Sequence, residues 1–244
     1  MKVLLVTVAG VSSRFSTSVG YQCLKCIYYT NDICESLLYK MVHQEEFDLY
    51  VIVGGFQFND LKQTVNVIFE KFPDRILLVY NDKYNLYGSG YSLFLGLRAL
   101  ENIKYDELVF AEGDLYVDNE SFRKVYSSVK NVITTNMKPI LAEKSVAFYF
   151  DTSFKLHYIY DTNHDVFEIS EPFTSIFNSA QIWKFTQPDK VLKTYKAISS
   201  LSWHGTNLVF IQAYFGDLSI DGFEIITFNQ WVNCNTVMDF NSIT

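Results

Sequence analysis

The sequence predicts an α/β fold in which helices flank a mostly parallel mixed sheet, with a smaller mixed β region in the second half. Over the first 118 residues, short apolar runs rich in β-branched side chains alternate with segments of helical spacing. Such alternation implies right-handed crossovers between parallel strands. From about residue 131, aromatic and β-branched runs follow one another without long helices between them, which favours mixed or antiparallel sheet.

The elements follow in order from their local patterns. The apolar runs that predict buried strands in the first half are residues 2–8, 48–53, 75–80 and 107–111. The segments between them that predict helices are residues 36–45, 59–71 and 91–101. In the second half, strands are expected at residues 132–135, 145–150, 155–160, 167–169 and 224–228. Helices are expected at residues 176–185 and 189–200, and a short helix after Trp231.

Composition narrows the class of protein. Hydrophobic residues make up 49% of the 244 residues, which provides for a sizeable core and fits one domain, 1–244. The net charge of −7 argues against nucleic acid as a partner. We see neither an apolar run long enough for membrane insertion nor a signal peptide, so we expect cytoplasmic residence. Four cysteines are too few for a disulfide scaffold, and two incidental thiols explain Cys23 and Cys26 better than a metal or redox pair.

The loop after the first strand carries the strongest chemical pattern. Ligands of open α/β sheets bind beyond the carboxyl ends of the strands. A glycine there lets backbone N–H groups approach phosphate oxygens, and an arginine and a lysine can neutralise a triphosphate. The alternative is a surface loop with two solvated cations. The residues concerned are Ala9, Gly10, Ser12, Ser13, Arg14 and Lys25, with Gly54 at the end of the second strand.

This loop resembles the signature of nucleotidyltransferases with a GT-A-like, Rossmann-like fold, in which Ala-Gly-x-Gly-x-Arg is followed by Pro-Lys-Pro. Gly10, Arg14 and Lys25 match the family's positions for nucleotide and α-phosphate binding. Ser12 replaces the second glycine, and other residues replace both prolines. In appearance the chain is most similar to phosphocholine and phosphonate cytidylyltransferases and to sugar-phosphate nucleotidyltransferases.

Two further segments extend the resemblance. Before the third predicted helix, Ser89, Gly90 and Ser92 match a segment that opens a helix near the nucleotide; simple helix capping by the serines is the alternative. After the fourth strand, Glu112 and Asp114 form a carboxylate pair. The resemblance makes Asp114 the magnesium-binding aspartate. Glu112 is expected either beside the base of the nucleotide or behind the residues that bind the ligand directly.

The last segment of the resemblance is near the C-terminus. Asn235 stands where the family has its second metal-binding aspartate, and its side-chain oxygen can still coordinate magnesium. The resemblance therefore implies Mg²⁺ as cofactor, held by Asp114 and Asn235. Thr236 and Asp239 are expected as the cap and first-turn charge of the terminal helix.

The implied reaction is magnesium-dependent transfer of a nucleoside monophosphate, with CTP favoured as donor, to a phosphorylated small molecule such as phosphocholine, a phosphonate or a sugar phosphate. Pyrophosphate leaves. Lys25, Arg14 and Asp114 are the expected catalytic residues, in a nucleotide-binding half (1–118) joined to an acceptor-binding half (119–244), as a monomer or homodimer. An acceptor phosphate is already mostly ionised at neutral pH, so no general base is needed. Two alternatives stay open: a glycosyltransferase of related fold that uses Glu112 and Asp114, or a non-catalytic nucleotide-binding protein.

Aromatic residues of the second half allow two interpretations. They can form a cage for a quaternary ammonium group, or they can belong to the core, as the alternation at 148 and 150 and at 158 and 160 indicates. The rings are Phe148, Phe150, Tyr158, Tyr160, Trp183 and Trp203. Asp161, Glu168 and Glu171 are near in sequence and can meet a cationic head group.

Overall fold

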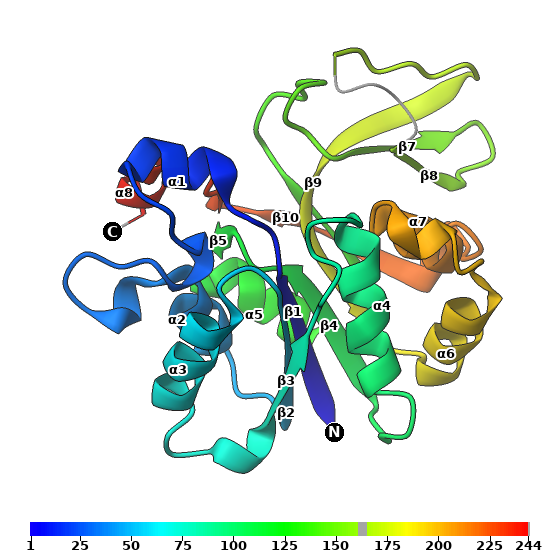
Figure 1. The fold of residues 1–244 in the computed structure, drawn as a ribbon. Coiled ribbons are helices and arrows are strands. Elements are labelled where there is room, and N and C mark those ends of the chain that lie inside the picture. Colours follow the sequence, from blue (N-terminus) through cyan, green and yellow to red (C-terminus); the bar gives the residue numbers. More distant parts are fainter. Residues whose placement is uncertain (161–164, 244) are drawn as a thin grey trace.

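A computed structural model describes residues 1–160 and 165–243. Its strands in the first half are β1 (Lys2–Val8), β2 (Leu49–Gly54), β3 (Ile76–Tyr80), β4 (Glu107–Glu112) and β5 (Leu115–Val117). Those of the second half are β6 (Asn131–Asn136), β7 (Ala147–Asp151), β8 (Leu156–Ile159), β9 (Phe173–Phe185), β10 (Phe223–Phe228) and β11 (Trp231–Asn233). Within the described residues, nine strands form one sheet whose main path is β10-β6-β9-β4-β1-β2-β3 (Figure 1).

The sheet combines a parallel core with one long antiparallel strand. β4, β1, β2 and β3 run parallel, and β10 is parallel to β6. β9 lies antiparallel between β4 and β6, and its first half carries β7 and β8 as an antiparallel extension. β5 and β11 pair separately. The predicted fold class is therefore confirmed, and strands from both halves share one sheet. The assignment of a single domain with two functional halves stays a prediction.

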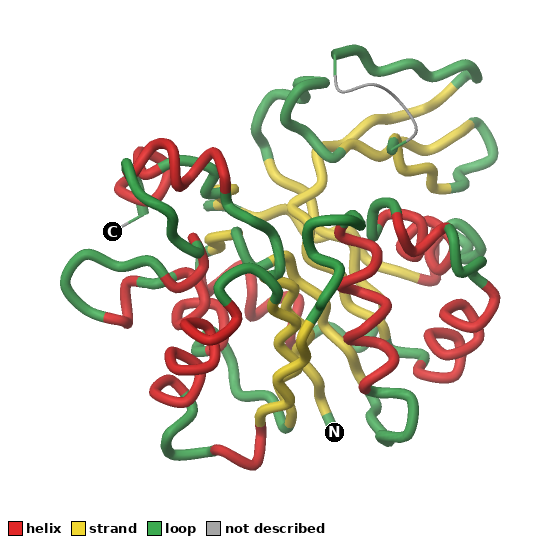
Figure 2. The backbone as a smooth tube through the Cα atoms, viewed as in Figure 1, coloured by secondary structure: helices red, strands yellow, loops and turns green. Residues whose placement is uncertain are grey.

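Helices cover both faces of the sheet (Figure 2). They are α1 (Ser13–Val19), α2 (Leu37–Val42), α3 (Phe58–Ile68), α4 (Ser89–Ala99), α5 (Asn119–Ser127), α6 (Pro188–Ala197), α7 (Leu208–Phe215) and α8 (Val237–Asn241). Alternation along β1 divides the core, because Val3 and Leu5 pack with α4, α6 and α7 while Leu4 and Val6 pack with α2, α3 and α5. Across the described residues, none of the helices has the length and apolar character needed to cross a bilayer.

Two sequence-based assignments are wrong. Residues 176–185, expected as a helix, belong to strand β9, and residues 167–169, expected as a strand, lie in a loop. The end of β9 is buried on both faces, so its residues show no polar alternation. Gln181 has a φ of 59°, and the register with β6 shifts nearby; this bulge hides the strand period further. The pattern gave no sign of α1 or α7, whereas Asp118, which the sequence favours as a helix cap, is the N-cap of α5.

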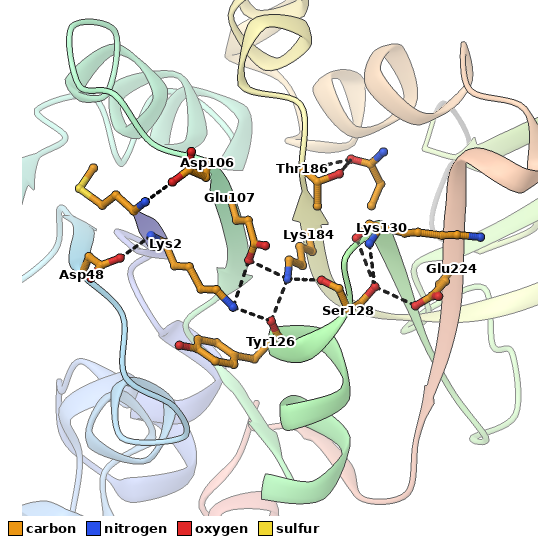
Figure 3. A network of polar contacts seen from close by, with 12 residues as sticks. Lys2, Asp48, Asp106, Glu107, Tyr126, Ser128, Lys130, Lys184, Thr186 and Glu224 are labelled. Carbon is orange, nitrogen blue, oxygen red and sulfur yellow. Dashed lines mark hydrogen bonds and ion pairs between the residues drawn. The ribbon is translucent and has the colours of Figure 1, made fainter.

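A buried lysine network fixes α5 at the end of the sheet where β1 and β4 begin (Figure 3). Lys184 of β9 is fully buried, and its ammonium group donates to the carbonyl oxygens of Tyr126 at 2.8 Å and Ser128 at 2.5 Å. It also forms an ion pair of 2.8 Å with Glu107. Burial lowers the pKa of Lys184. The cation satisfies carbonyl groups that the end of a helix leaves unpaired, so α5 is held from within the sheet.

Candidate active site

A cavity of about 250 Å³ opens beyond the carboxyl ends of β1 and β4. Its walls are the loop from β1 to α1, the 3-10 turn Lys25–Ile27, the chain leading into α4, and the end of β4. The lining residues are Thr7, Val8, Ala9, Gly10, Ser12, Leu24, Lys25, Cys26, Tyr84, Tyr87, Gly88, Ser89, Ser92, Glu112, Gly113 and Asp114. The cavity thus occupies the place where ligands bind in open α/β sheets.

Lys25, which lines this cavity, is the centre of a polar cluster. Its Nζ donates to Asp114 Oδ2 at 2.7 Å and to Asn235 Oδ1 at 3.3 Å. Arg14 Nη2 donates to the same Asn235 oxygen at 2.9 Å. Segments more than 200 residues apart in sequence therefore meet at one point, with two cations and one carboxylate together.

Local backbone geometry positions each member of the cluster. Ser12 precedes α1 in the left-handed region, with a φ of 53°, and its hydroxyl accepts from the Lys25 N–H at 3.3 Å. The carbonyl of Asp114 accepts from the Cys234 N–H at 2.8 Å, which ties the β11–α8 segment to the end of β4. The predicted cap is confirmed: Thr236 and Asp239 form a capping box at α8.

The two carboxylates at the end of β4 have different surroundings. Asp114 Oδ1 is buried and makes no hydrogen bond within the described part of the chain. Glu112 Oε1 accepts from Asn207 Nδ2 at 2.6 Å. Burial, with a smaller effect of the Asp114 charge, raises the pKa of Glu112 to about 7. A buried oxygen without a donor is a high-energy arrangement that a bound cation relieves.

The start of α4 forms another part of the cavity wall. The Gly88 N–H donates to His204 O at 2.7 Å and the Gly90 N–H to Gly205 O at 2.9 Å, so these donors are taken by protein. The serines do not cap the helix, because Gly88 is the cap residue and no side chain bonds there. Ser92 Oγ instead accepts from Asn81 Nδ2 at 2.9 Å, and Ser89 Oγ accepts from the Asn207 N–H at 3.1 Å.

The structure brings most of the predicted site residues to the cavity. Those that line it are Ala9, Gly10, Ser12, Lys25, Ser89, Ser92, Glu112 and Asp114. Arg14 and Asn235 adjoin it through their contacts with each other and with Lys25. Three predicted residues do not line it. Ser13 is exposed on α1. The space beside Gly54 is filled by Leu61 and Phe58 of α3, and the space beside Gly90 by the 203–206 backbone.

Sequence reasoning missed two residues of the cavity wall and one residue that holds the wall from behind. Asn207 is 1% exposed and bonds both Glu112 and Ser89. Tyr84 and Tyr87 line the cavity, and the Tyr87 ring stacks on His204 with a centroid distance of 3.8 Å. A tyrosine-rich loop before a helix offered a weak signal for the rings. No sequence signal pointed to Asn207, because an asparagine before a helix is common.

The aromatic rings considered for a cage belong mostly to the core. Phe148, Phe150, Tyr158, Trp183 and Trp203 are all buried, and none lines the cavity. Tyr160 is half-buried and packs against the same core. Trp183 Nε1 donates to the Tyr158 hydroxyl at 2.7 Å. Of the acidic residues, Glu168 and Glu171 are exposed, and Asp161 lies outside the described residues.

Cys23 and Cys26 are free thiols, and burial raises the pKa of both. Residues 1–160 and 165–243 hold no group of three or more His, Cys, Asp or Glu side chains arranged for a metal ion. A metal ion in this cavity would therefore need oxygen atoms from a ligand or from water beside those of the protein.

Comparison with known proteins places the fold and leaves the activity open. The model of a family described as a domain of unknown function, DUF6564, matches residues 21–244. No curated protein matches the chain significantly.

Among solved structures, the inositol-1-phosphate CTP transferase from T. maritima superposes with a TM-score of 0.66 at 17% identity, covering 98% of this chain and 91% of that one. The CTP:phosphocholine cytidylyltransferase from Streptococcus pneumoniae gives 0.63 at 15%, with coverages of 99% and 96%. A UDP-glucose pyrophosphorylase complexed with UDP-glucose gives 0.68 at 11%, with coverages of 100% and 97%. These similarities confirm the nucleotidyltransferase-like fold that the sequence predicted.

Proposed function

Because the chain belongs to the DUF6564 family, whose function is unknown, we propose its activity from its own cavity and fold. We infer that it transfers a nucleoside monophosphate from a nucleoside triphosphate to a phosphorylated small molecule and releases pyrophosphate. CTP is the favoured donor, since two proteins of similar fold are named for reactions of CTP. The observation that carries the proposal is the cluster of Lys25, Asp114, Asn235 and Arg14 at the cavity.

The cations of this cluster fit the phosphates of the donor. Lys25 is only 18% exposed yet reaches the cavity, and Arg14 presents a planar fork suited to phosphate oxygens. Together they neutralise the negative charge of a triphosphate and fix its position. Placing and neutralising the transferred group supplies most of the catalysis in such reactions.

Asp114 and Asn235 fit a divalent cation. Asp114 offers a buried oxygen that lacks a donor, and Asn235 offers a neutral oxygen that accepts from the same Lys25 ammonium group as Asp114 does. Mg²⁺ takes one or two protein oxygens and completes its shell with phosphate oxygens and water. When bound, the ion would withdraw charge from the phosphates and orient them.

The chemical step needs no proton transfer by the protein. An ionised oxygen of the acceptor's phosphate or phosphonate attacks the α-phosphorus of the triphosphate. A new P–O bond forms, the bond to the β-phosphate oxygen breaks, and pyrophosphate leaves with that electron pair. Lys25 and Arg14 hold the phosphates in line for this displacement. Phosphocholine, a phosphonate or a sugar phosphate would enter from the half formed by residues 119–244.

Pyrophosphate release tests the proposal. The full chain with Mg²⁺ is incubated with CTP, UTP, GTP, ATP or dTTP and with phosphocholine, aminoethylphosphonate or several sugar 1-phosphates. We expect turnover with at least one pair, CTP foremost, and its loss in Lys25→Ala but not in the exposed control Lys62→Ala. Binding of nucleotide without release would favour a non-catalytic binding protein. Sugar transfer from a nucleotide sugar would favour a glycosyltransferase.

A further inference from the structure

We propose that Glu112 binds the ribose hydroxyl groups of the nucleotide and so selects ribonucleoside triphosphates over deoxyribonucleoside triphosphates. The inference rests on the proposed function, and it assigns Glu112 a role that the displacement at phosphorus does not require.

Contacts link Glu112 to chemically different parts of the cavity lining. Lys25, which also lines the cavity, pairs with Asp114. Tyr84 and Tyr87 line the same cavity, and aromatic residues suit the flat base of a nucleotide. Glu112 is two residues from Asp114 and is linked through Asn207 to Ser89 at the start of α4. A nucleotide whose phosphates lie at Lys25 and whose base lies at the rings therefore brings its sugar to Glu112.

The charges around Glu112 support the same assignment of this residue to the ribose. Within the described residues, Lys25 and Asp114 form an ion pair while Glu112 has no cation within 4.0 Å. Without a cation beside it, the Glu112 side chain has nothing to attract phosphate oxygens, and its acceptor oxygens suit a neutral donor of hydrogen bonds in the neighbouring part of the ligand. The hydroxyl pair of ribose is such a donor, and acidic side chains bind it in other nucleotide sites at the ends of parallel strands.

The Glu112 carboxyl group is also fixed in position and can accept a further hydrogen bond. Its Oε1 is fixed by the 2.6 Å bond from Asn207 Nδ2, and Asn207 is itself anchored by its N–H to Ser89 Oγ. Along the chain that the structure describes, no second hydrogen bond reaches the Glu112 carboxylate. Its remaining acceptor capacity therefore faces a cavity that it helps to line.

Calorimetry on the full chain with Mg²⁺ tests the inference. The probes are CTP, 2′-deoxy-CTP, 3′-deoxy-CTP and UTP. We expect at least one deoxy form to bind about 10- to 100-fold more weakly than CTP, as for loss of a hydrogen bond to a charged group. In Glu112→Gln this ratio should fall to about threefold or less while the deoxy form binds nearly as before. Asn207→Ala should reduce the ratio in the same direction. Glu70→Gln, an exposed carboxylate on the surface, is the control.

The outcomes separate the two proposals. Equal binding of CTP and both deoxy forms by the unaltered protein would overturn the role of Glu112 while leaving nucleotidyl transfer intact. A ribose preference that survives in Glu112→Gln would also overturn it. A change in the ratio of CTP to UTP, with the ribose preference unaltered, would assign Glu112 to the base. No binding of any triphosphate would contradict both proposals. Because the first comparison uses the unaltered chain, it does not depend on how the variants fold.

Discussion

Lys25 and Asp114, 89 residues apart in sequence, form a 2.7 Å ion pair in which both side chains keep about a fifth of their surface exposed. Both therefore combine a fixed position with access to a ligand. We predict that Lys25→Ala and Asp114→Ala each reduce turnover by about 10²- to 10⁴-fold, because each removes charge stabilisation at the transferred phosphate. Pyrophosphate release measures the effect.

Folding is the control for this pair. Lys25 and Asp114 are not core residues, so circular dichroism melting should change by only a few degrees in either variant. Near-normal rates in both alanine variants would contradict the mechanism. A collapse in melting temperature would instead assign the pair a structural role.

Asn235 is neutral, so it offers a cation less negative charge than an aspartate at the same position would. We predict that Asn235→Asp binds Mn²⁺ at least several-fold more tightly than the unaltered protein, because a second carboxylate joins Asp114 near one point. Electron paramagnetic resonance of free Mn²⁺, without nucleotide, measures the affinity. Asn229→Asp adds the same charge on an exposed loop and serves as the control. Equal affinities in all three proteins would remove Asn235 from the metal site.

Gly88 lies where a side chain cannot fit. A Cβ atom there would lie 2.4 Å from Gly205 O, a backbone atom that cannot turn aside. We predict that Gly88→Ala lowers the free energy of unfolding in urea by about 1–3 kcal/mol, as overpacking does elsewhere. Gly10→Ala is the matched control for stability, since a Cβ atom there meets nothing within 4 Å. Equal stability of the two variants would mean that the 203–206 segment moves freely away from α4.

Glu35 provides a test of pH dependence. Its carboxylate accepts from the N–H groups of Thr30 and Asn31 and from both their side chains. These bonds, the Thr30 N–H foremost, lower the pKa of Glu35 to about 2 from its usual 4.5. A carboxyl group with a lower pKa in the folded state stabilises the fold above its unfolded pKa and loses that effect as pH falls.

We therefore predict that Glu35→Gln is less stable than the unaltered protein by a constant amount above about pH 5. The difference should shrink as the pH falls from 4.5 toward about 2. Urea titrations at several pH values measure it, and NMR titration of the carboxyl carbon gives the pKa directly. A Glu35 carboxyl that titrates near 4.5 would show that the Thr30 and Asn31 bonds do not persist in solution.

The parallel part of the fold could be predicted because its strands are short, β-branched and separated by helices. Residues 2–8 were placed without error as β1. The long strand β9 could not be predicted, because its buried end lies between β4 and β6 and carries a bulge at Gln181. Periodicity identifies a strand only where one face meets water.

The candidate site also contains residues that the sequence could predict and one that it could not. Lys25, Asp114 and Asn235 were found through short motifs at strand ends, and the structure puts their side chains within hydrogen-bonding distance. Asn207 has no motif, because its importance comes from contacts with Glu112 and Ser89, which are distant in sequence. A long-range contact of one amide group leaves no periodic trace in a sequence.

The central position of β9 determines how a fragment of this chain would behave. Its residues Ile182–Phe185 are the antiparallel neighbours of Leu108–Ala111 in β4, and all four of those β4 residues are buried. A fragment ending at residue 118 would lose that neighbour and present an apolar strand with unpaired backbone groups, which is a template for aggregation. Any expressed form of the chain for crystallisation, display or fusion should therefore keep both halves in one polypeptide.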